Sequence, residues 1–325
     1  MSLKDDVLDA LSNKQDFISG QQLANQLGVS RNAIWKAINS LKDQGYEFES
    51  VTNLGYKLSH TGDVLTNRGV EKFLDEKERF EIHILSEASS TNSMLKELAE
   101  NGEQQGLVLA TTYQVAGRGR GKRSFYSPKD KGIYFSLLLN PKIEPQKAID
   151  ITLIAGVSLV KAIKDVTNID TQIKWVNDVY YKDKKIAGIL SEASLSFENG
   201  EMRYVVVGLG LNLIEPVGGY PKEIRDVAGA LFESAPNIPD LRNRLIAKTL
   251  NYILYYVDNI DKREYVNEYK KLQWLTNKNV QIIRSDKVVG VGRVIGLDNE
   301  CHLLVQHTDG EIEHLSSGEV RVRIK

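Results

Sequence analysis

The chain has 325 residues, of which 42% are hydrophobic and 26% are charged, ordinary values for a soluble globular protein. Its length exceeds the roughly 250–300 residues at which single cores give way to several domains, so we expect two or three. The formal net charge of −1 excludes nucleic-acid binding through a global positive field, and any such binding must come from a local patch.

Cysteine content and hydropathy limit the cellular locations that fit this chain. The single cysteine, Cys301, excludes an internal disulfide and fits a reducing, cytoplasmic location. The acidic, polar N-terminus does not resemble a signal peptide. No apolar run approaches the roughly 18 residues that suggest a membrane span, so we expect no membrane association.

The first sixty residues predict a winged helix-turn-helix. Apolar residues recur at helical spacing over 3–13, and two serine caps predict further helices that end near Leu27 and Gln44. Alternating residues over 46–58 predict a hairpin, the wing. Polar side chains on the second and third helices are the predicted DNA-binding residues. They are Gln21, Ser30, Arg31, Asn32, Trp35, Lys36 and Asn39.

Charge does not decide whether this segment binds DNA. Residues 1–60 carry six Lys/Arg and seven Asp/Glu, a net of −1, whereas a strong non-specific DNA binder is more basic. Weak binding that requires dimerisation or a ligand fits this balance better. A three-helix protein-interaction module is the alternative.

A helix over 67–77 and a strand over 80–85 are predicted next. The polar run Ser90-Thr91-Asn92 then opens a helix that extends to about Asn101. Such a run is most often a helix cap. The same exposed N–H groups and hydroxyls can also hold a small polar ligand.

The stretch 112–129 is the strongest functional signal. It combines glycines at alternate positions with five cations and no acid. Glycine lets backbone N–H groups approach a ligand, consecutive amides form an anion nest, and arginine adds bidentate donors. Repulsion among the cations predicts a loop that is mobile until an anion binds; a solvated basic loop is the alternative. These residues are Gly117, Arg118, Gly119, Arg120, Gly121, Lys122, Arg123 and Lys129.

Three later segments add polar groups. Asn177 and Asp178 adjoin between two strand-like pieces. Lys185 opens an otherwise apolar strand, where a lone lysine needs a partner or an anion. Gly208, on the predicted buried strand 204–213, permits close approach to the backbone.

Neither glycine motif matches a standard nucleotide-binding loop. In the first motif, Ala116 stands where a Walker loop has its first glycine, and Arg123 stands where it has Ser or Thr. In the second, 208–212 lack the third glycine of the dinucleotide fingerprint. If a nucleotide binds, it does so through another architecture.

In the C-terminal third the residue pattern changes from helical spacing to short alternating segments. Helices over 240–258 and 261–273 precede short alternating strands between 280 and 315, which predict a small β-barrel-like domain. His302 and His307 lie an odd number of residues apart and so face opposite ways on a regular strand. We therefore expect no metal site from side-chain clusters.

In order, these motifs resemble the bifunctional biotin protein ligases that also repress biotin synthesis, and the resemblance covers essentially the whole chain. It implies an α+β multidomain fold. A winged helix-turn-helix spans 1–62, a central α+β ligase domain with a mixed sheet spans 63–273, and an SH3-like barrel spans 274–325. The motifs are the helix-turn-helix, Ser90-Thr91-Asn92, Gln114 with Gly-Arg-Gly-Arg, Lys-Trp-x-Asn-Asp, Lys185-x-Ala-Gly-Ile-Leu-x-Glu and Gly208-x-Gly-x-Asn212.

The resemblance implies two half-reactions. ATP and biotin, with Mg²⁺, give biotinyl-5′-AMP, and biotin then passes to a lysine of a biotin carboxyl carrier domain. The adenylate is also the implied co-repressor, promoting a homodimer that binds operator DNA. The implied catalytic residues are Arg118, the main candidate for electrostatic catalysis, with Lys185 and Asp178.

Residue-by-residue comparison with the family's motifs implies two binding sets. The biotin set is Ser90, Thr91, Asn92, Gln114, Gly117, Arg118, Gly119, Arg120 and Lys185. The nucleotide set is Arg120, Arg123, Phe125, Asn177, Gly208 and Asn212.

Three departures from the family pattern stand out. Gly121 and Lys122 exchange the expected order, Phe125 replaces a tryptophan, and Val176 replaces a proline. The first two predict altered loop closure. Two other functions stay open: a lipoate-type acyl ligase or octanoyl transferase, and a DNA-binding regulator with an inactive ligase domain.

Overall fold

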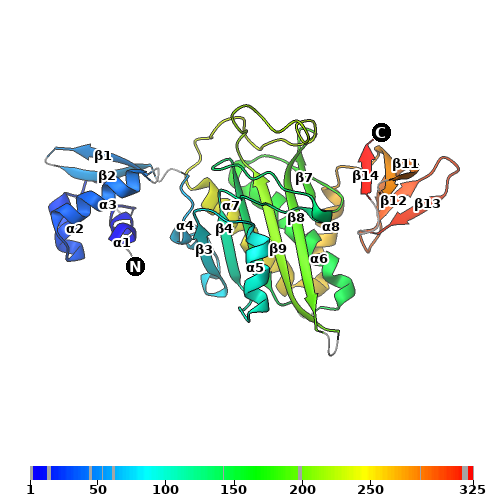
Figure 1. Cartoon of the computed structure of the whole chain (residues 1–325), viewed down its shortest axis with the longest axis horizontal. Helices are drawn as coiled ribbons and strands as arrows, with labels where there is room; N and C mark the ends of the chain where they lie inside the picture. Colours follow the sequence, from blue (N-terminus) through cyan, green and yellow to red (C-terminus); the bar gives the residue numbers. More distant parts are fainter. Residues whose placement is uncertain are drawn as a thin grey trace. The chain divides into compact units, whose positions relative to one another are not determined.

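The computed structural model describes residues 3–12, 16–43, 46–52, 54–60, 63–141, 143–196, 200–285, 287–316 and 321–324. The chain divides into two compact units (Figure 1). One comprises the residues up to Gly69 together with Asn237–Arg244, and the other comprises Val70–Pro236 and Leu245–Lys325.

The first unit is a winged helix-turn-helix, as predicted. Ser19 caps the second helix, its side chain accepting from the N–H of Gln22, and Gly28 ends that helix in the left-handed conformation at φ 65°. The predicted end at Gln44 lies outside the described residues. The elements are α1 (Leu3–Ser12), α2 (Gly20–Leu27), α3 (Arg31–Asp43), β1 (Glu47–Val51) and β2 (Gly55–His60).

One apolar stripe of α3 forms the core of this unit. Ile34, Ile38 and Leu41 are at most 1% exposed, and they pack against Leu11 and Leu23 of the other helices. Because this stripe is buried, the opposite side of α3 faces solvent.

The segment that follows the wing is held in place by the chain around residue 242. The N–H of Arg242 donates to Asp63 at 2.6 Å, and the Asn243 side chain donates to the Val64 carbonyl at 2.7 Å. The N–H of Thr66 in turn donates to Asn243 at 3.1 Å. The segment after the wing is thus held by hydrogen bonds within the first unit.

The helix predicted over 67–77 is shorter than expected. α4 spans Asn67–Glu71 and is followed by the 3₁₀ turn Lys77–Arg79. Asn251 explains the early end, because its side chain accepts from the N–H of Asp75 and donates to the carbonyl of Phe73. These bonds replace those that a continuing helix would make.

The second unit contains a seven-stranded sheet, which is mixed as predicted. Its order is β3-β4-β5-β9-β8-β7-β6, with β3 and β4 parallel and all other neighbours antiparallel. The strands are β3 (Glu81–Leu85), β4 (Leu107–Thr111), β5 (Gly132–Leu139), β6 (Gln172–Lys174), β7 (Asp178–Tyr181), β8 (Lys184–Leu195) and β9 (Met202–Asn212).

Helices cover both faces of this sheet (Figure 1). α5 (Thr91–Glu100) packs through Leu95 on a face that includes Val206. Val206 pairs with Glu192, so Glu192 shares the α5 face. α6 (Ala148–Thr167) covers the other face, where Thr152 bonds to Ser191 at 2.9 Å. The remaining helices are α7 (Leu241–Asp258) and α8 (Glu264–Lys271).

A five-stranded antiparallel sheet forms the C-terminal part of the second unit. Its order is β13-β12-β11-β10-β14, and the last strand was not predicted. The strands are β10 (Asn279–Arg284), β11 (Lys287–Leu297), β12 (Leu303–Gln306), β13 (Ile312–Leu315) and β14 (Arg321–Ile324). Across the described residues, no helix is both long and apolar enough to span a lipid bilayer.

Candidate functional site

The glycine- and arginine-rich stretch 112–129 forms a hairpin beside the sheet. The N–H of Gly119 donates to the Arg123 carbonyl at 2.7 Å, and the N–H of Phe125 donates to the Gly117 carbonyl at 2.8 Å. A Cβ at residue 117 would lie 2.5 Å from the Phe125 carbonyl oxygen and 2.6 Å from Ser127 Oγ. Glycine is therefore required at 117 by packing within the hairpin.

The exchanged pair Gly121-Lys122 suits the backbone of the hairpin tip. Gly121 has φ 63° and ψ 44° inside the 3₁₀ turn Arg120–Lys122. An L-residue with a side chain is strained there. The departure from the family order thus places glycine at a left-handed position.

The polar run before and in α5 faces inward. Ser90 caps the helix, accepting from the N–H of Ser93 at 3.5 Å, which confirms the capping role. Gln114 accepts from the N–H of Thr91 at 2.9 Å, and the Thr91 hydroxyl bonds to Ser136 at 2.8 Å. The hairpin is therefore linked to the start of α5 and to β5.

Glu192 of β8 joins this network to the hairpin. Its carboxylate accepts a hydrogen bond from Asn92 Nδ2 at 2.6 Å. It also accepts from both terminal nitrogens of Arg118, at 3.0 and 3.2 Å. Arg118 also donates to Ser93 at 3.3 Å. Arg118 is thus ion-paired with Glu192, so the repulsion expected among the cations of the loop is offset at this residue.

Glu192 was not among the predicted site residues. Its signal lay in the sequence as the last residue of the Lys185-x-Ala-Gly-Ile-Leu-x-Glu motif. Its partner was hidden, because the pair joins residues 74 positions apart in the chain.

A second polar cluster lies at the turn between β6 and β7 and the start of β8. Arg120 donates to Asn177 Oδ1 at 3.1 Å, and Asn177 donates to the Ile189 carbonyl at 2.8 Å. Lys185 Nζ lies 2.5 Å from Asp178 Oδ1, so the partner predicted for this lysine is present. Burial lowers the pKa of Arg120, and the charge of Asp178 opposes that shift. An arginine remains protonated in spite of such a shift.

Phe125 anchors the end of the hairpin to the sheet. A Cβ at Gly210 would lie 2.6 Å from its ring, and one at Gly188 would lie 3.3 Å away. Gly188 and Gly210 pair across β8 and β9, and together they form a slot for the ring. At Gly208, a Cβ would meet Asn92 Oδ1 at 2.5 Å. Close approach to the β9 glycines is confirmed, and the approaching groups are Asn92 and Phe125.

Two residues of the predicted nucleotide set lie apart from these clusters. Arg123 is exposed. Asn212 donates to the Gly229 carbonyl at 2.9 Å, which fastens the loop after β9. The structure therefore brings together most of the predicted set, divided into an Arg118–Glu192 group and an Arg120–Lys185 group.

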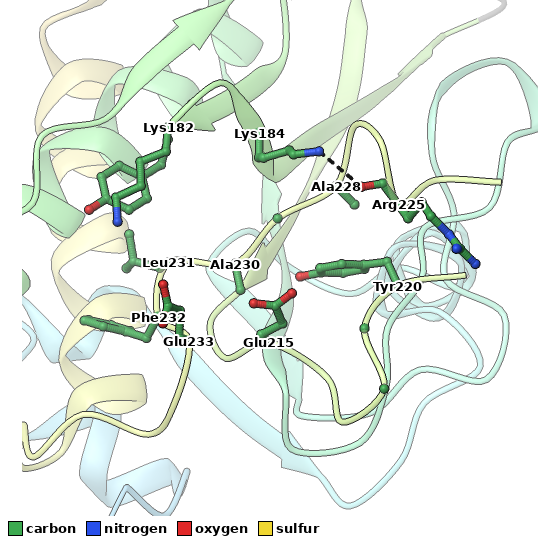
Figure 2. Close-up of a pocket in the computed structure, with 14 residues that line it drawn as sticks. Lys182, Lys184, Glu215, Tyr220, Arg225, Ala228, Ala230, Leu231, Phe232 and Glu233 are labelled. Atoms are coloured by element: carbon green, nitrogen blue, oxygen red, sulfur yellow. Dashed lines mark hydrogen bonds between the residues drawn. The ribbon is translucent and has the colours of Figure 1, made fainter. Parts of the chain in front are cut away.

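A cavity of about 500 Å³ lies under the loop after β9 (Figure 2). Lys184 donates to the Asp226 carbonyl at 2.7 Å at its rim, and Glu215 and Tyr220 point toward one another within it. None of the described residues that line it belongs to the predicted ligand set. We place the candidate site at the polar clusters instead, because they hold the groups capable of acid–base and anion chemistry.

A smaller cavity of about 250 Å³ does include a predicted residue. Arg120 lines it with Val176, Ile189 and the first turn of α6. Arg120 therefore borders both the Asn177–Asp178 turn and an internal space.

The predicted DNA-binding side chains mostly lie on the exposed side of α3. Arg31, Asn32 and Lys36 are exposed, Trp35 is 54% exposed, and Asn39 is half-buried. The other two have local partners. The Ser30 side chain accepts from the N–H of Ala33 and caps α3, and Gln21 donates to Asn25.

Three family models match consecutive parts of the chain. The helix-turn-helix domain matches residues 4–57, the biotin/lipoate A/B protein ligase family matches 85–212, and the biotin protein ligase C-terminal domain matches 276–323. Their order is that of the units and sheets described above.

Full-length relatives agree. The bifunctional ligase/repressor BirA of Bacillus subtilis is 31% identical over 99% of both chains, and that of Escherichia coli is 30% identical over 97% of this chain and 96% of its own. The biotin protein ligase of Aquifex aeolicus, solved in complex with biotin and ATP, superposes with a TM-score of 0.62 at 28% identity, covering 75% of this chain and 99% of that one. The chain therefore belongs to the biotin protein ligase family, among its bifunctional ligase/repressors.

Proposed function

We propose that the chain forms biotinyl-5′-AMP from biotin and ATP and transfers biotin to a lysine of a biotin carboxyl carrier domain. We further propose that biotinyl-AMP makes it a repressor of genes for biotin synthesis or transport. The observation that carries the ligase proposal is the placing of Arg120 and Lys185 beside Asn177 and Asp178. The proposed domains are 1–62, 63–273 and 274–325.

In the first half-reaction, a carboxylate oxygen of biotin attacks the α-phosphorus of ATP, and the bond to pyrophosphate breaks. Both reactants are anions, so positive charge fixed between them lowers the barrier. Arg120 and Lys185 supply that charge, and Arg118 adds to it when a substrate anion replaces Glu192. Asp178 is the carboxylate that would hold Mg²⁺, which would neutralise charge on the triphosphate.

In the second half-reaction, the carrier lysine's amine attacks the acyl carbon of biotinyl-AMP. The bond from that carbon to the phosphate oxygen breaks, and AMP leaves. The amine must lose a proton, and Asp178 is the proposed acceptor. Since Asp178 lies 2.5 Å from Lys185 Nζ, that pairing must open before Asp178 can act.

The two half-reactions separate the roles of Asp178. We expect Asp178→Asn to slow transfer from preformed biotinyl-AMP more than it slows adenylate formation, measured as pyrophosphate release. If transfer is slowed no more than adenylation, the base role is excluded.

Most of the proposed binding residues lie in the two clusters, and Arg123 and Asn212 lie outside them. The hydrogen bonds around Gln114, Thr91 and Asn92 support the biotin set, which is Ser90, Thr91, Asn92, Gln114, Gly117, Arg118, Gly119, Arg120 and Lys185. The Arg120–Asn177 contact supports the nucleotide set, which is Arg120, Arg123, Phe125, Asn177, Gly208 and Asn212.

Pyrophosphate release with alternative acids tests the ligase proposal. Biotin is expected to stimulate release from ATP, and lipoate is expected to have little effect. Stimulation by lipoate alone would identify the lipoate-type ligase. No release with either acid would identify a regulator with an inactive ligase domain.

The exposed polar side of α3 supports the repressor proposal. Ordering of a ligand site lowers the entropic cost of a later docking step, so adenylate binding favours a homodimer. We expect operator affinity, measured by gel shift, to rise when biotin and ATP are added together. Equal affinity with and without both ligands would contradict the co-repressor role. A cytoplasmic location fits these partners.

A further inference from the structure

A third cluster of side chains with binding chemistry lies in the C-terminal sheet, apart from the ligand site. Asp298 is in the turn between β11 and β12, His302 ends that turn, and His314 lies on β13. Oδ2 of Asp298 is 2.9 Å from Nδ1 of His302 and 2.9 Å from Nδ1 of His314.

The register of β12 and β13 brings the two histidines together. His314 pairs with Leu304, and His302 lies two residues before Leu304, so both point to the same face. Leu303 and Leu315 point into the core instead. His307 has a different partner, since its Nε2 lies 2.9 Å from Glu313. The expectation of no metal site rested on His302 and His307 alone, whereas the second imidazole of the cluster is His314, on the neighbouring strand.

The two carboxylate oxygens of Asp298 have different partners. Oδ1 accepts from the N–H groups of Glu300 and His302, each at 2.9 Å, which closes the turn. Oδ2 faces the imidazoles. Oδ2 is thus the carboxylate oxygen placed to bind a metal ion together with the two imidazoles.

We propose that Asp298, His302 and His314 bind one divalent transition-metal ion of the Zn²⁺, Ni²⁺ or Co²⁺ class. Two imidazole nitrogens and one carboxylate oxygen suit these ions. The three ligand atoms all lie within 4.8 Å of one another. Ligands about 2.1 Å from a metal lie about 3 Å apart along an octahedral edge, and Asp298 Oδ2 lies 2.9 Å from Nδ1 of each histidine.

Neighbouring chemistry narrows the choice of ion and ligands. Mg²⁺ prefers oxygen ligands, so two imidazoles disfavour it and separate this site from the Mg²⁺ used with ATP. The buried Cys301 thiol is not among the groups that gather here, so the protein ligands are Asp298 and the two histidines. Water fills the remaining coordination positions.

A bound ion would stabilise the turn between β11 and β12, which also accepts hydrogen bonds from other parts of the second unit. Arg263 donates to Glu300 at 3.1 Å and to the Asn299 carbonyl at 2.8 Å. Trp175 Nε1 donates to the Cys301 carbonyl at 3.0 Å. An ion that links Asp298 to β13 therefore stabilises the folded chain.

The test is a titration of the full chain, without a polyhistidine tag and stripped with a chelator, against Zn²⁺, Ni²⁺, Co²⁺ and Mg²⁺ by calorimetry. We expect one transition-metal ion per chain and no comparable binding of Mg²⁺. His302→Gln and His314→Gln are each expected to weaken Zn²⁺ binding at least about tenfold. Zn²⁺ is expected to raise the thermal midpoint of the wild type but not that of His314→Gln.

His307→Gln is the matched control, because His307 lies at the end of the same pair of strands but bonds to Glu313. It should keep wild-type affinity. His314→Gln changes an exposed side chain outside the turn, so it decides the question even if the turn variants fold poorly. The proposal is overturned if the wild type fails to bind Zn²⁺, if His314→Gln keeps wild-type affinity, or if His307→Gln loses as much.

Discussion

Glu192 binds the Arg118 guanidinium through both carboxylate oxygens, at 3.0 and 3.2 Å. Arg118 lies on the glycine hairpin and Glu192 on a central strand of the sheet, so the pair fastens the hairpin to the sheet. Any substrate anion that uses Arg118 must compete with this carboxylate. Asn92 donates to the same Glu192 oxygen, Oε2, that accepts from one Arg118 nitrogen, and Glu192 acts through Arg118 as a positioning residue.

Replacing Glu192 with Gln should loosen the hairpin. The variant keeps an oxygen that accepts from Asn92 but loses the charge that holds Arg118. A partly exposed pair of this kind contributes about 1 kcal/mol, so tryptic cleavage within the ligand-free hairpin should rise about fivefold. Glu97→Gln, at an exposed position of α5, is the control. Equal cleavage rates in the two variants would contradict the fastening role.

Arg120 should matter more than Arg118 for adenylation. Sequence resemblance placed Arg118 first, but Arg120 adjoins Asn177 and feels the charge of Asp178. Loss of a charge-stabilising donor in an active site costs about 10²–10³ in rate, which we expect for Arg120→Ala in pyrophosphate release. A smaller loss is expected for Arg118→Ala. The reverse order would restore Arg118 as the main electrostatic residue.

Gly117 and Gly119 should respond differently to a methyl group. A Cβ at 117 would meet the Phe125 carbonyl at 2.5 Å, whereas one at 119 has its nearest neighbour at 3.4 Å and φ there is −126°. Gly117→Ala should therefore disrupt the hairpin and speed tryptic cleavage of the ligand-free protein. Gly119→Ala, the matched control, should cleave at nearly the wild-type rate. Similar behaviour of the two would show that packing does not require Gly117.

Trp175→Phe should weaken nucleotide binding from a distance. Trp175 donates to the Cys301 carbonyl at 3.0 Å and precedes Asn177 by two residues. The variant keeps an aromatic ring and loses one hydrogen bond, a stability cost of about 1 kcal/mol in urea unfolding. We expect KM for ATP to rise because Asn177 loses support.

The control for this substitution is Trp274→Phe, which removes a similar bond to Asp183 at 3.1 Å. It should lower stability comparably and leave KM for ATP nearly unchanged. Equal effects on KM would reduce the role of Trp175 to general stability.

His307 should make stability depend on pH near neutrality. The hydrogen bond that His307 donates to the Glu313 carboxylate raises the pKa of His307 above its ordinary value of 6.5. A raised pKa means that this stabilisation is fully present below 6.5 and is lost as pH rises through the folded-state value. The urea midpoint of the wild type should therefore fall over this range more steeply than that of His307→Gln. Parallel pH profiles would exclude this contribution.

Local signals in the sequence were enough to predict most elements. The two ends of α2 could be predicted from Ser19 and Gly28, because a helix cap and a left-handed turn depend on adjacent residues. The buried side of α3 could be predicted from Ile34 and Ile38, because helical spacing is also a local property of the sequence. α4 was overextended because the groups that end it come from Asn251, far along the chain.

The sequence by itself determined the order of domains and the motif residues that supply charge and glycine. Only the tertiary structure decided their partners: Glu192 for Arg118, Asn177 for Arg120, and His314 beside His302 and Asp298. The physical reason is that side-chain hydrogen bonds act over about 3 Å. Strand register and sheet order set such separations between distant segments, and neither is encoded in the spacing of a single motif.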